Sequence, residues 1–215
     1  MQQFEVPIKV PVDPDANTTD LLVERVRQTP DAALFAIPTG DGGWSDVSAR
    51  EFHRQVIALA KGLVANGIEP GDKIGLMAKT SYEWTLIDFA TWFAGAVLVP
   101  IYDTNAPSQI HWNLIDSGAV AIITENADHA ARFDEIRADV PLVRSVWRLD
   151  LGDLDKIAAA GTGVADEEIE RRRELAIGAA PATVIYTSGS TGKPKGCVIT
   201  HTNFVALSQN AQAAI

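Results

Sequence analysis

The feature that most constrains the fold of this 215-residue chain is the alternation of helical hydrophobic patterns with short runs rich in β-branched residues. The stretch "SAREFHRQVIALAKGLVANG" (48–67) places Phe52, Val56 and Leu63 on one helical face. "KIGLMA" (73–78) then reads as a buried strand. Strands that alternate with helices of this length indicate βαβ units. We therefore predict an α/β fold with a mostly parallel sheet and helices on both faces.

The same cycle recurs along the rest of the chain. Ser48 and Glu51 have the spacing of a capping box at the start of the first helix, and Gly67 fits its C-terminal stop. The further predicted strands are 97–101, 120–124, 145–149 and 182–187, and the further predicted helices are 81–96, 110–115, 127–138, 165–178 and 201–215.

Two stretches interrupt this alternation. "IPTGDGGWSDVS" (37–48) predicts a local hairpin at the edge of the sheet, because "TGDGG" is a turn sequence. Residues 150–166 are rich in Gly, Ala and Asp and form the best candidate for a linker. No internal repeat or low-complexity tract is found in the sequence.

Composition and charge exclude several classes of partner. The formal net charge of −10 argues against a nucleic-acid partner, because nucleic acid binds to clusters of Lys and Arg. The start of the chain has no basic segment followed by an apolar run, and no stretch approaches the ~18 apolar residues of a membrane span. The lone Cys197 cannot close an intramolecular disulfide, which suits a reducing compartment. We therefore expect a cytoplasmic protein without a transmembrane segment.

The stretch between Thr187 and Lys195 is polar and glycine-rich, although apolar residues flank it on both sides. It follows a predicted strand and precedes a predicted helix, which is where α/β proteins place ligand-contacting loops. Its hydroxyls, its two glycine N–H groups and its two lysines could all donate to one compact acceptor, as a phosphate chain requires.

Two familiar phosphate motifs are nevertheless absent. Walker A needs four residues between its glycines and a hydroxyl after its lysine, whereas Gly189 stands three before Gly192 and Pro194 follows Lys193. The dinucleotide pattern G-x-G-x-x-G is also missing. Composition alone therefore leaves two interpretations open: a phosphate site or an ordinary solvated turn.

The segment "YTSGSTGKPKG", from Tyr186 to Gly196, resembles the phosphate-binding signature of the adenylate-forming superfamily, Y-T-S-G-[ST]-T-G-x-P-K-G, at every position. That superfamily comprises acyl-CoA synthetases, the adenylation domains of nonribosomal peptide synthetases, and beetle luciferases. Residues 70–77, 94–102 and 116–124 resemble other segments of its large N-terminal domain in the right order. "SYEWTLIDFA" with "VPIYDTNAPSQIHWNL" is most similar to long-chain fatty acid–CoA ligases.

The resemblance implies a two-step reaction. A carboxylate attacks the α-phosphate of Mg·ATP to give an acyl-adenylate and pyrophosphate, and coenzyme A then displaces AMP. Carried over, the signature would bind the ATP phosphates through hydroxyls, glycine N–H groups and lysines. These residues are Thr187, Ser188, Gly189, Ser190, Thr191, Gly192, Lys193 and Lys195, of which Lys193 occupies the variable position. The implied ligands are a fatty acid, ATP, Mg²⁺ and coenzyme A.

The resemblance also implies that residues 1–215 are a partial N-terminal AMP-binding domain. The family's Y-G-x-T-E and T-G-D motifs and its small C-terminal domain are absent from this sequence. We therefore assign no catalytic residue and no metal ligand, and we expect no complete reaction from this chain. We also expect the chain to self-associate. The sequence is compatible with peripheral contact with a membrane. The alternatives are an adenylation domain that loads a carrier protein and a non-catalytic nucleotide- or phosphate-binding module.

Other residues that could carry chemistry have simpler interpretations. The histidines are dispersed without metal-ligand spacing, and His201 is expected to enter the last helix beside a capping Thr202. The run 171–173, "RRR", stands among glutamates and predicts a solvated helix face. Cys197 is expected to be buried and inert. We interpret Trp84, Trp92 and Trp112 as packing residues and assign no role to Asp103 or Asp116.

Overall fold

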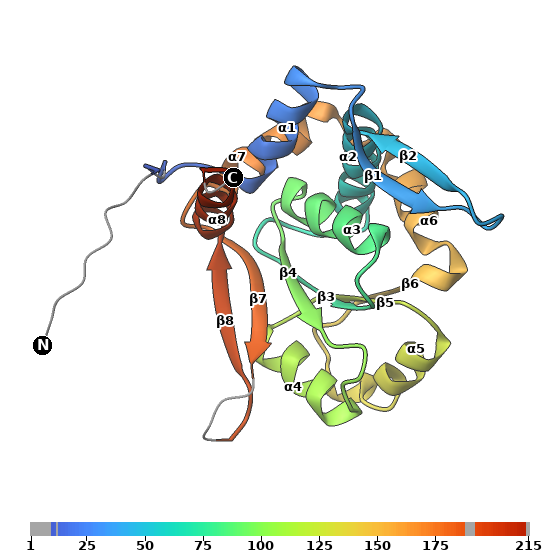
Figure 1. The fold of residues 1–215 in the computed structure, drawn as a ribbon. Coiled ribbons are helices and arrows are strands. Elements are labelled where there is room, and N and C mark those ends of the chain that lie inside the picture. The colour runs from blue at the N-terminus through green and yellow to red at the C-terminus, as the bar shows by residue number, and fades with distance from the viewer. Residues whose placement is uncertain (1–9, 12, 188–191, 214–215) are drawn as a thin grey trace, which may run out of the picture.

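The computed structural model describes residues 10–11, 13–187 and 192–213 and confirms the α/β class (Figure 1). Its strands form a six-stranded sheet in the order β6-β5-β3-β4-β7-β8, in which neighbouring strands are parallel except for the antiparallel pair β7–β8. The strands are β3 (Lys73–Met77), β4 (Val97–Ile101), β5 (Ala121–Thr124), β6 (Ser145–Arg148), β7 (Pro181–Thr187) and β8 (Lys195–Thr200).

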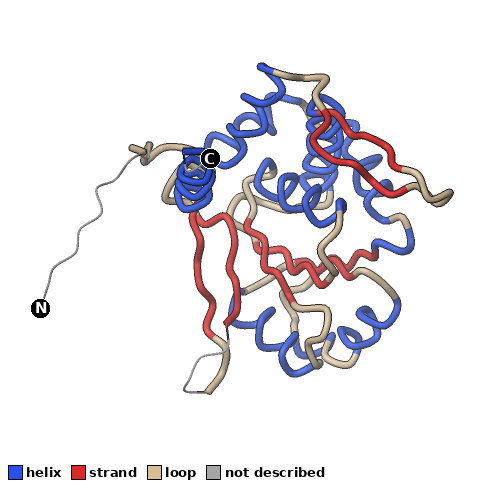
Figure 2. The backbone as a smooth tube through the Cα atoms, in the orientation of Figure 1, coloured by secondary structure: helices blue, strands red, loops and turns tan. Residues whose placement is uncertain are grey.

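Helices cover both faces of the sheet (Figures 1 and 2). Helices α2 and α3 pack on one face, with α6 and α7 against them, and α4 and α5 pack on the other. The helices are α1 (Thr18–Gln28), α2 (Ala49–Ala65), α3 (Tyr82–Phe93), α4 (Pro107–Ser117), α5 (Ala127–Asp134), α6 (Asp153–Ala160), α7 (Asp166–Leu175) and α8 (His201–Ala213). Helix α1 was not predicted from the sequence.

The buried strands contribute side chains to two hydrophobic cores, because successive side chains point to opposite faces of a sheet. Along β3, Ile74 and Leu76 join the core under α2 and α3, whereas Met77 joins the core under α4 and α5. On β5, Ile123 joins the first core and Ile122 the second. This two-sided burial explains why the parallel strands read as continuous apolar runs.

The predicted ends of the first long helix, α2, are confirmed. The Ser48 hydroxyl accepts a hydrogen bond from the Glu51 backbone N–H at 3.2 Å, and Gly67 lies just beyond the helix with φ of 80°. The Glu51 carboxylate does not complete the capping box, because it instead accepts hydrogen bonds from Arg54 and Gln55.

The predicted hairpin is present, but it is not at the edge of the main sheet. Strands β1 (Ala33–Pro38) and β2 (Trp44–Ser48) pair antiparallel and form a separate two-stranded sheet. Phe35 on β1 packs against Phe52 of α2 with ring centroids 4.8 Å apart. The hairpin therefore contacts the outer surface of the helices and extends their core.

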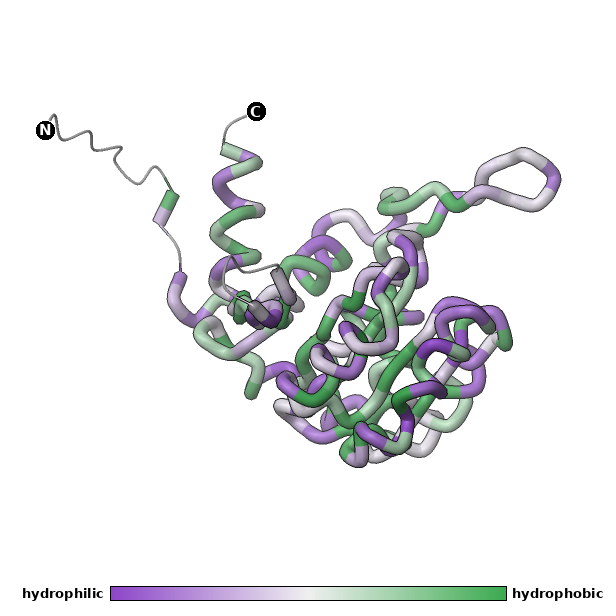
Figure 3. Tube along the Cα trace, turned by 90° about the horizontal axis from the view of Figure 1, so that it is seen from below, coloured by the Kyte–Doolittle hydropathy of each residue, from purple (hydrophilic) through white to green (hydrophobic). Residues whose placement is uncertain are grey.

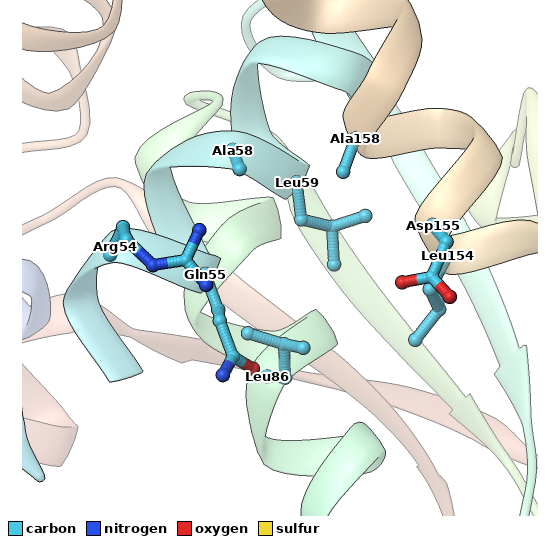
Figure 4. Close-up of a pocket in the computed structure, with 8 residues that line it drawn as sticks. All are labelled: Arg54, Gln55, Ala58, Leu59, Leu86, Leu154, Asp155 and Ala158. Carbon is cyan, nitrogen blue, oxygen red and sulfur yellow. The ribbon is translucent and has the colours of Figure 1, made fainter. Parts of the chain in front are cut away.

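The linker prediction for residues 150–166 is wrong, because this stretch contains α6 and a 3₁₀ turn packed on α2. A Cβ atom at Gly62 would lie 2.0 Å from the Ile157 carbonyl oxygen, and one at Gly161 would lie 2.3 Å from the Gly62 nitrogen. The glycines thus permit close approach of two backbones rather than flexibility. Figure 4 shows the hollow of about 300 Å³ where α2, α3 and α6 meet, and Leu59, Leu86 and Leu154 are among its lining residues.

The arginine run on α7 is not a solvated face throughout. Arg172 is only 4% exposed, and its guanidinium donates to the Ile68 carbonyl at 2.6 Å and pairs with Glu69 and Glu168. Arg173 lies over the ring of Phe93. Mixed charge on α7 suggested a solvent-facing surface, but the long side chains here reach neighbouring backbone and aromatic groups.

Helix α8 projects from the body of the protein and carries a mixture of apolar and polar residues, as the tube next to the C label in Figure 3 shows. Its first residue, His201, is fully buried. Nδ1 of His201 lies 3.0 Å from Thr18 Oγ1, and that hydroxyl also lies 3.5 Å from the His201 carbonyl oxygen. Nε2 is buried without a hydrogen-bond partner among the described residues.

His201 makes the stability of the fold depend on pH. Burial lowers the pKa of His201 to about 4, whereas the pKa of a histidine in the unfolded chain is about 6.5. The unfolded chain therefore takes up the proton first, and stability is lost as pH falls from 6.5 toward 4. We expect the free energy of unfolding of the parent chain to fall by about 2 kcal/mol more than that of His201→Asn between pH 7 and pH 5. Urea denaturation at the two pH values measures both free energies. A difference independent of pH would contradict this.

Candidate phosphate-binding site

The described phosphate-binding candidates, Thr187, Gly192, Lys193 and Lys195, lie where β7 ends and β8 begins, near the carboxyl edge of the parallel strands (Figures 1 and 2). Strand β7 pairs with β4 through the single position Leu98–Thr183 and then continues as a hairpin with β8. Thr187 pairs with Lys195 across the mouth of the loop. Because directly opposite residues share a face, both side chains project to the same side of the hairpin.

The two ends of the signature fit each other sterically. Tyr186 pairs with Gly196, and a Cβ atom at Gly196 would lie 3.2 Å from the Tyr186 ring and 2.9 Å from Val184. The Tyr186 hydroxyl donates to the Asp116 carboxylate of α4 at 2.8 Å. Burial of the phenol and this carboxylate raise the pKa of Tyr186 above its ordinary value, so the hydroxyl keeps its proton and its role as donor.

The return arm of the loop is held by the same helix. Trp112 of α4 donates its indole N–H to the Pro194 carbonyl at 2.8 Å. The Lys193 ammonium lies over the indole ring, 4.1 Å from its centroid. Gly192 has φ of 128°, a conformation that a residue with a side chain rarely adopts. The backbone on this side of the loop therefore has a defined course fixed by α4.

The structure brings four of the eight predicted site residues together around the loop. Thr187 ends β7, Gly192 and Lys193 lie on the return arm, and Lys195 begins β8. Neither lysine forms an ion pair with an acidic side chain of the described part of the chain. The other four predicted residues, Ser188, Gly189, Ser190 and Thr191, lie outside the described residues.

Two hollows border this edge of the sheet. One, of about 310 Å³, lies between α4 and the hairpin and is lined by Thr187, Pro194, Tyr186 and the amides Asn105, Gln109 and Asn113. The other, of about 380 Å³, has mainly apolar walls and lies where β3 and β4 end. Tyr102 lines both hollows and is 64% exposed. The carboxyl edge of the sheet thus offers a space lined by three side-chain amides beside the loop and a more apolar space next to it.

Sequence reasoning missed the two α4 residues that contact the hairpin. Trp112 was interpreted only as a packing residue, and Asp116 was given no role. The two residues stand four positions apart on α4, so they share a helical face. That spacing was visible in the sequence, but their partners lie 70 or more positions away along the chain.

Two predictions beside the loop are wrong. Cys197 is exposed rather than buried, because β8 is the last strand in the described sheet and its first four residues are exposed. Thr202 does not cap α8, since the Asn203 backbone N–H donates to Thr200 Oγ1 at 3.3 Å, whereas the Thr202 hydroxyl donates to the Pro14 carbonyl. The predicted packing role holds for Trp92, which is buried.

Neither a metal cluster nor a membrane-crossing helix is found in the described ranges. In residues 10–11, 13–187 and 192–213, no three His, Cys, Asp or Glu side chains gather so that they could hold a metal ion. Over the same ranges, every helix is too short or too polar to cross a membrane.

Comparison with known proteins identifies the family. The sequence profile of the family described as AMP-binding enzyme matches residues 22–214. The long-chain-fatty-acid–CoA ligase FadD15 of Mycobacterium bovis is 37% identical over 216 aligned residues, which cover 99% of this chain and 36% of that protein. A feruloyl-CoA synthase of an Amycolatopsis species is 31% identical over 84% of this chain and 33% of its own length. The chain thus spans about a third of these relatives.

A solved structure agrees with this assignment. The inhibitor-bound N-terminal domain of FACL13 from Mycobacterium tuberculosis matches with a TM-score of 0.70 and 28% identity, over 86% of this chain and 44% of that domain. The fold is therefore that of the N-terminal domain of adenylate-forming enzymes. The chain belongs to the AMP-binding enzyme family, as the signature resemblance predicted.

The contact between Tyr186 and Gly196 gives a test of the site's construction. Because Asp116 holds the Tyr186 ring, Gly196→Ala should force the hairpin arms apart and lower the free energy of unfolding by about 1–3 kcal/mol. Urea denaturation measures this. Gly163→Ala is the matched control, since a Cβ there meets nothing within 4 Å. Equal stability of Gly196→Ala and the parent chain would contradict the close fit.

Proposed function

We propose that this chain supplies the ATP phosphate-binding part of an acid–thiol ligase that activates a long-chain fatty acid as its coenzyme A thioester. The proposed protein forms an acyl-adenylate from the carboxylate and ATP, and then transfers the acyl group to the thiol of coenzyme A. In this proposal residues 1–215 form part of the N-terminal AMP-binding domain.

The observation that carries the proposal is the complete signature on a hairpin whose two arms are held by one helix. Thr187 and Lys195 face each other at the mouth of the loop, and Lys193 stands beside them on the return arm. The Thr187 hydroxyl, the two ammonium groups and the Gly192 N–H at one end of the hairpin match the many acceptor oxygens of a pyrophosphate. The similarity to FadD15 supports the fatty acid as the carboxylic substrate.

In the proposed mechanism the loop binds the β- and γ-phosphates and leaves the α-phosphate open to the carboxylate. The carboxylate oxygen forms a bond to the α-phosphorus as the bond to the bridging oxygen of pyrophosphate breaks. Negative charge then increases on the pyrophosphate, where Lys195 and the loop hydroxyls stabilise it. The eight signature residues assigned from sequence, including Ser188–Thr191, are all retained in this proposal.

Mg²⁺ is proposed to reach the site with the nucleotide phosphates. The described residues do not offer three acidic or imidazole ligands in one place, so no residue of this chain is assigned to the metal. Coenzyme A is likewise proposed as a substrate of the whole protein, without an assigned contact here. The cytoplasmic location and the self-association of this chain also stay proposals.

Substitution of the loop donors tests this function on the 215-residue chain. Thr187→Ala and Lys195→Ala should each weaken the binding of magnesium pyrophosphate by about three- to tenfold, because each removes a donor to a charged acceptor. Isothermal titration calorimetry measures the affinities. Lys156→Ala on α6 is the control, since it removes another exposed lysine that pairs with Asp153. Affinities equal to that of the parent chain in both loop variants would contradict the assigned site.

A further inference from the structure

Helix α4 is a rigid support for the hairpin. Ile110 and Leu114 are 0% and 1% exposed and pack into the core with Met77 and Phe133. A Cβ atom at Gly75 of β3 would lie only 3.0 Å from Leu114, so the helix lies close against the sheet. Close packing of this kind leaves little room for α4 to shift relative to the parallel strands.

The N-terminal end of α4 is fixed as well. The Arg132 guanidinium from α5 donates to the backbone carbonyls of Asp103 at 2.7 Å and Asn105 at 3.3 Å, just before the helix. The Gln109 side chain accepts a hydrogen bond from the Ala106 N–H at 2.9 Å. Side chains on the exposed face of α4 therefore start from a backbone that is held at its beginning and along its buried face.

Trp112 makes two different contacts with the return arm from this support. Its indole N–H binds the Pro194 carbonyl, and its ring lies under the Lys193 ammonium. The first contact fixes the backbone one residue before Lys195, and the second holds a positive charge at the loop. Proline at 194 adds to this, because its ring restricts φ to about −65°.

We propose that Trp112 is a positioning residue of the phosphate loop: it holds the return arm and the Lys193 ammonium in place before the ligand binds. This inference rests on the proposed function and names the residue that prepares the site. A return arm held in advance loses less conformational entropy on binding, so the same contacts give a higher affinity. It also gives Lys193, the variable position of the signature, a defined partner.

Two substitutions at Trp112 separate its contacts. Trp112→Phe keeps an aromatic ring for the Lys193 ammonium and removes the donor to Pro194, whereas Trp112→Leu removes both. We expect magnesium pyrophosphate to bind about threefold more weakly to Trp112→Phe and about tenfold more weakly to Trp112→Leu. Trp147→Phe on β6 is the matched control and should bind as the parent chain does. Calorimetric titration gives the affinities, and thermal melting shows that each variant is folded.

A double-mutant cycle distinguishes positioning from general support of the fold. In a Lys193→Met background, replacing Trp112 by Leu should cost clearly less affinity than in the parent chain, because one of its two contacts is already gone. Lys193→Arg should lose less affinity than Lys193→Met, since a guanidinium keeps the positive charge and also binds an aromatic face. If the losses of affinity in Trp112→Leu and Lys193→Met add fully in the double variant, the proposal is wrong. This holds even if one of the variants is less stable than the parent chain.

The outcomes also separate this inference from the proposed function. If Lys195→Ala weakens pyrophosphate binding and Trp112→Leu leaves it unchanged, the positioning role is wrong and the phosphate site stands. If the parent chain binds no pyrophosphate, or if neither Lys195→Ala nor Thr187→Ala weakens its binding, the site itself is wrong and the role of Trp112 falls with it.

Discussion

The arrangement of the candidate site depends on the way α4 holds both arms of the β7–β8 hairpin. The Asp116 carboxylate accepts a hydrogen bond from the Tyr186 hydroxyl at the end of β7, and the Trp112 indole N–H donates one to the Pro194 carbonyl just before β8. These residues stand one helical turn apart, so a single helix face defines the spacing of the two arms. Because α4 is packed into the sheet through Ile110 and Leu114, the position of the two arms follows from the core. Burial of apolar side chains therefore sets the geometry of a polar site.

Glycine has a packing function in two places of this structure. Gly196 makes room for the ring of Tyr186, which explains why the first and last positions of the signature belong together. Gly62 and Gly161 let α6 approach the backbone of α2 closely. In both cases the missing side chain allows contact between segments that are distant in sequence. The free energy gained from such contacts depends on the partner, which local sequence does not reveal.

The sequence predicted the α/β class, the order of most strands and helices, and the location of the signature, because these depend on local periodicity and on one specific motif. The predictions that were wrong depended on long-range contacts. Residues 150–166 looked like a linker, but Gly161 packs against the backbone of α2, and Arg172 looked solvated although it binds the Ile68 carbonyl. Cys197 looked buried because it stands near the start of a predicted strand, yet the first four residues of β8 are exposed. Trp112 and Asp116 could be seen as a pair on one helix face, but the hairpin they contact could not.

We propose that the hairpin loop recognises the pyrophosphate end of ATP. Comparing the affinities of ligands that contain or lack this group tests that proposal. Calorimetric titration of the chain with magnesium pyrophosphate, Mg·ATP and AMP, at one ionic strength, compares the affinities. We predict that pyrophosphate and ATP bind within about threefold of each other and that AMP binds at least about tenfold more weakly. AMP binding as tightly as ATP, or ATP binding without measurable binding of pyrophosphate, would contradict it.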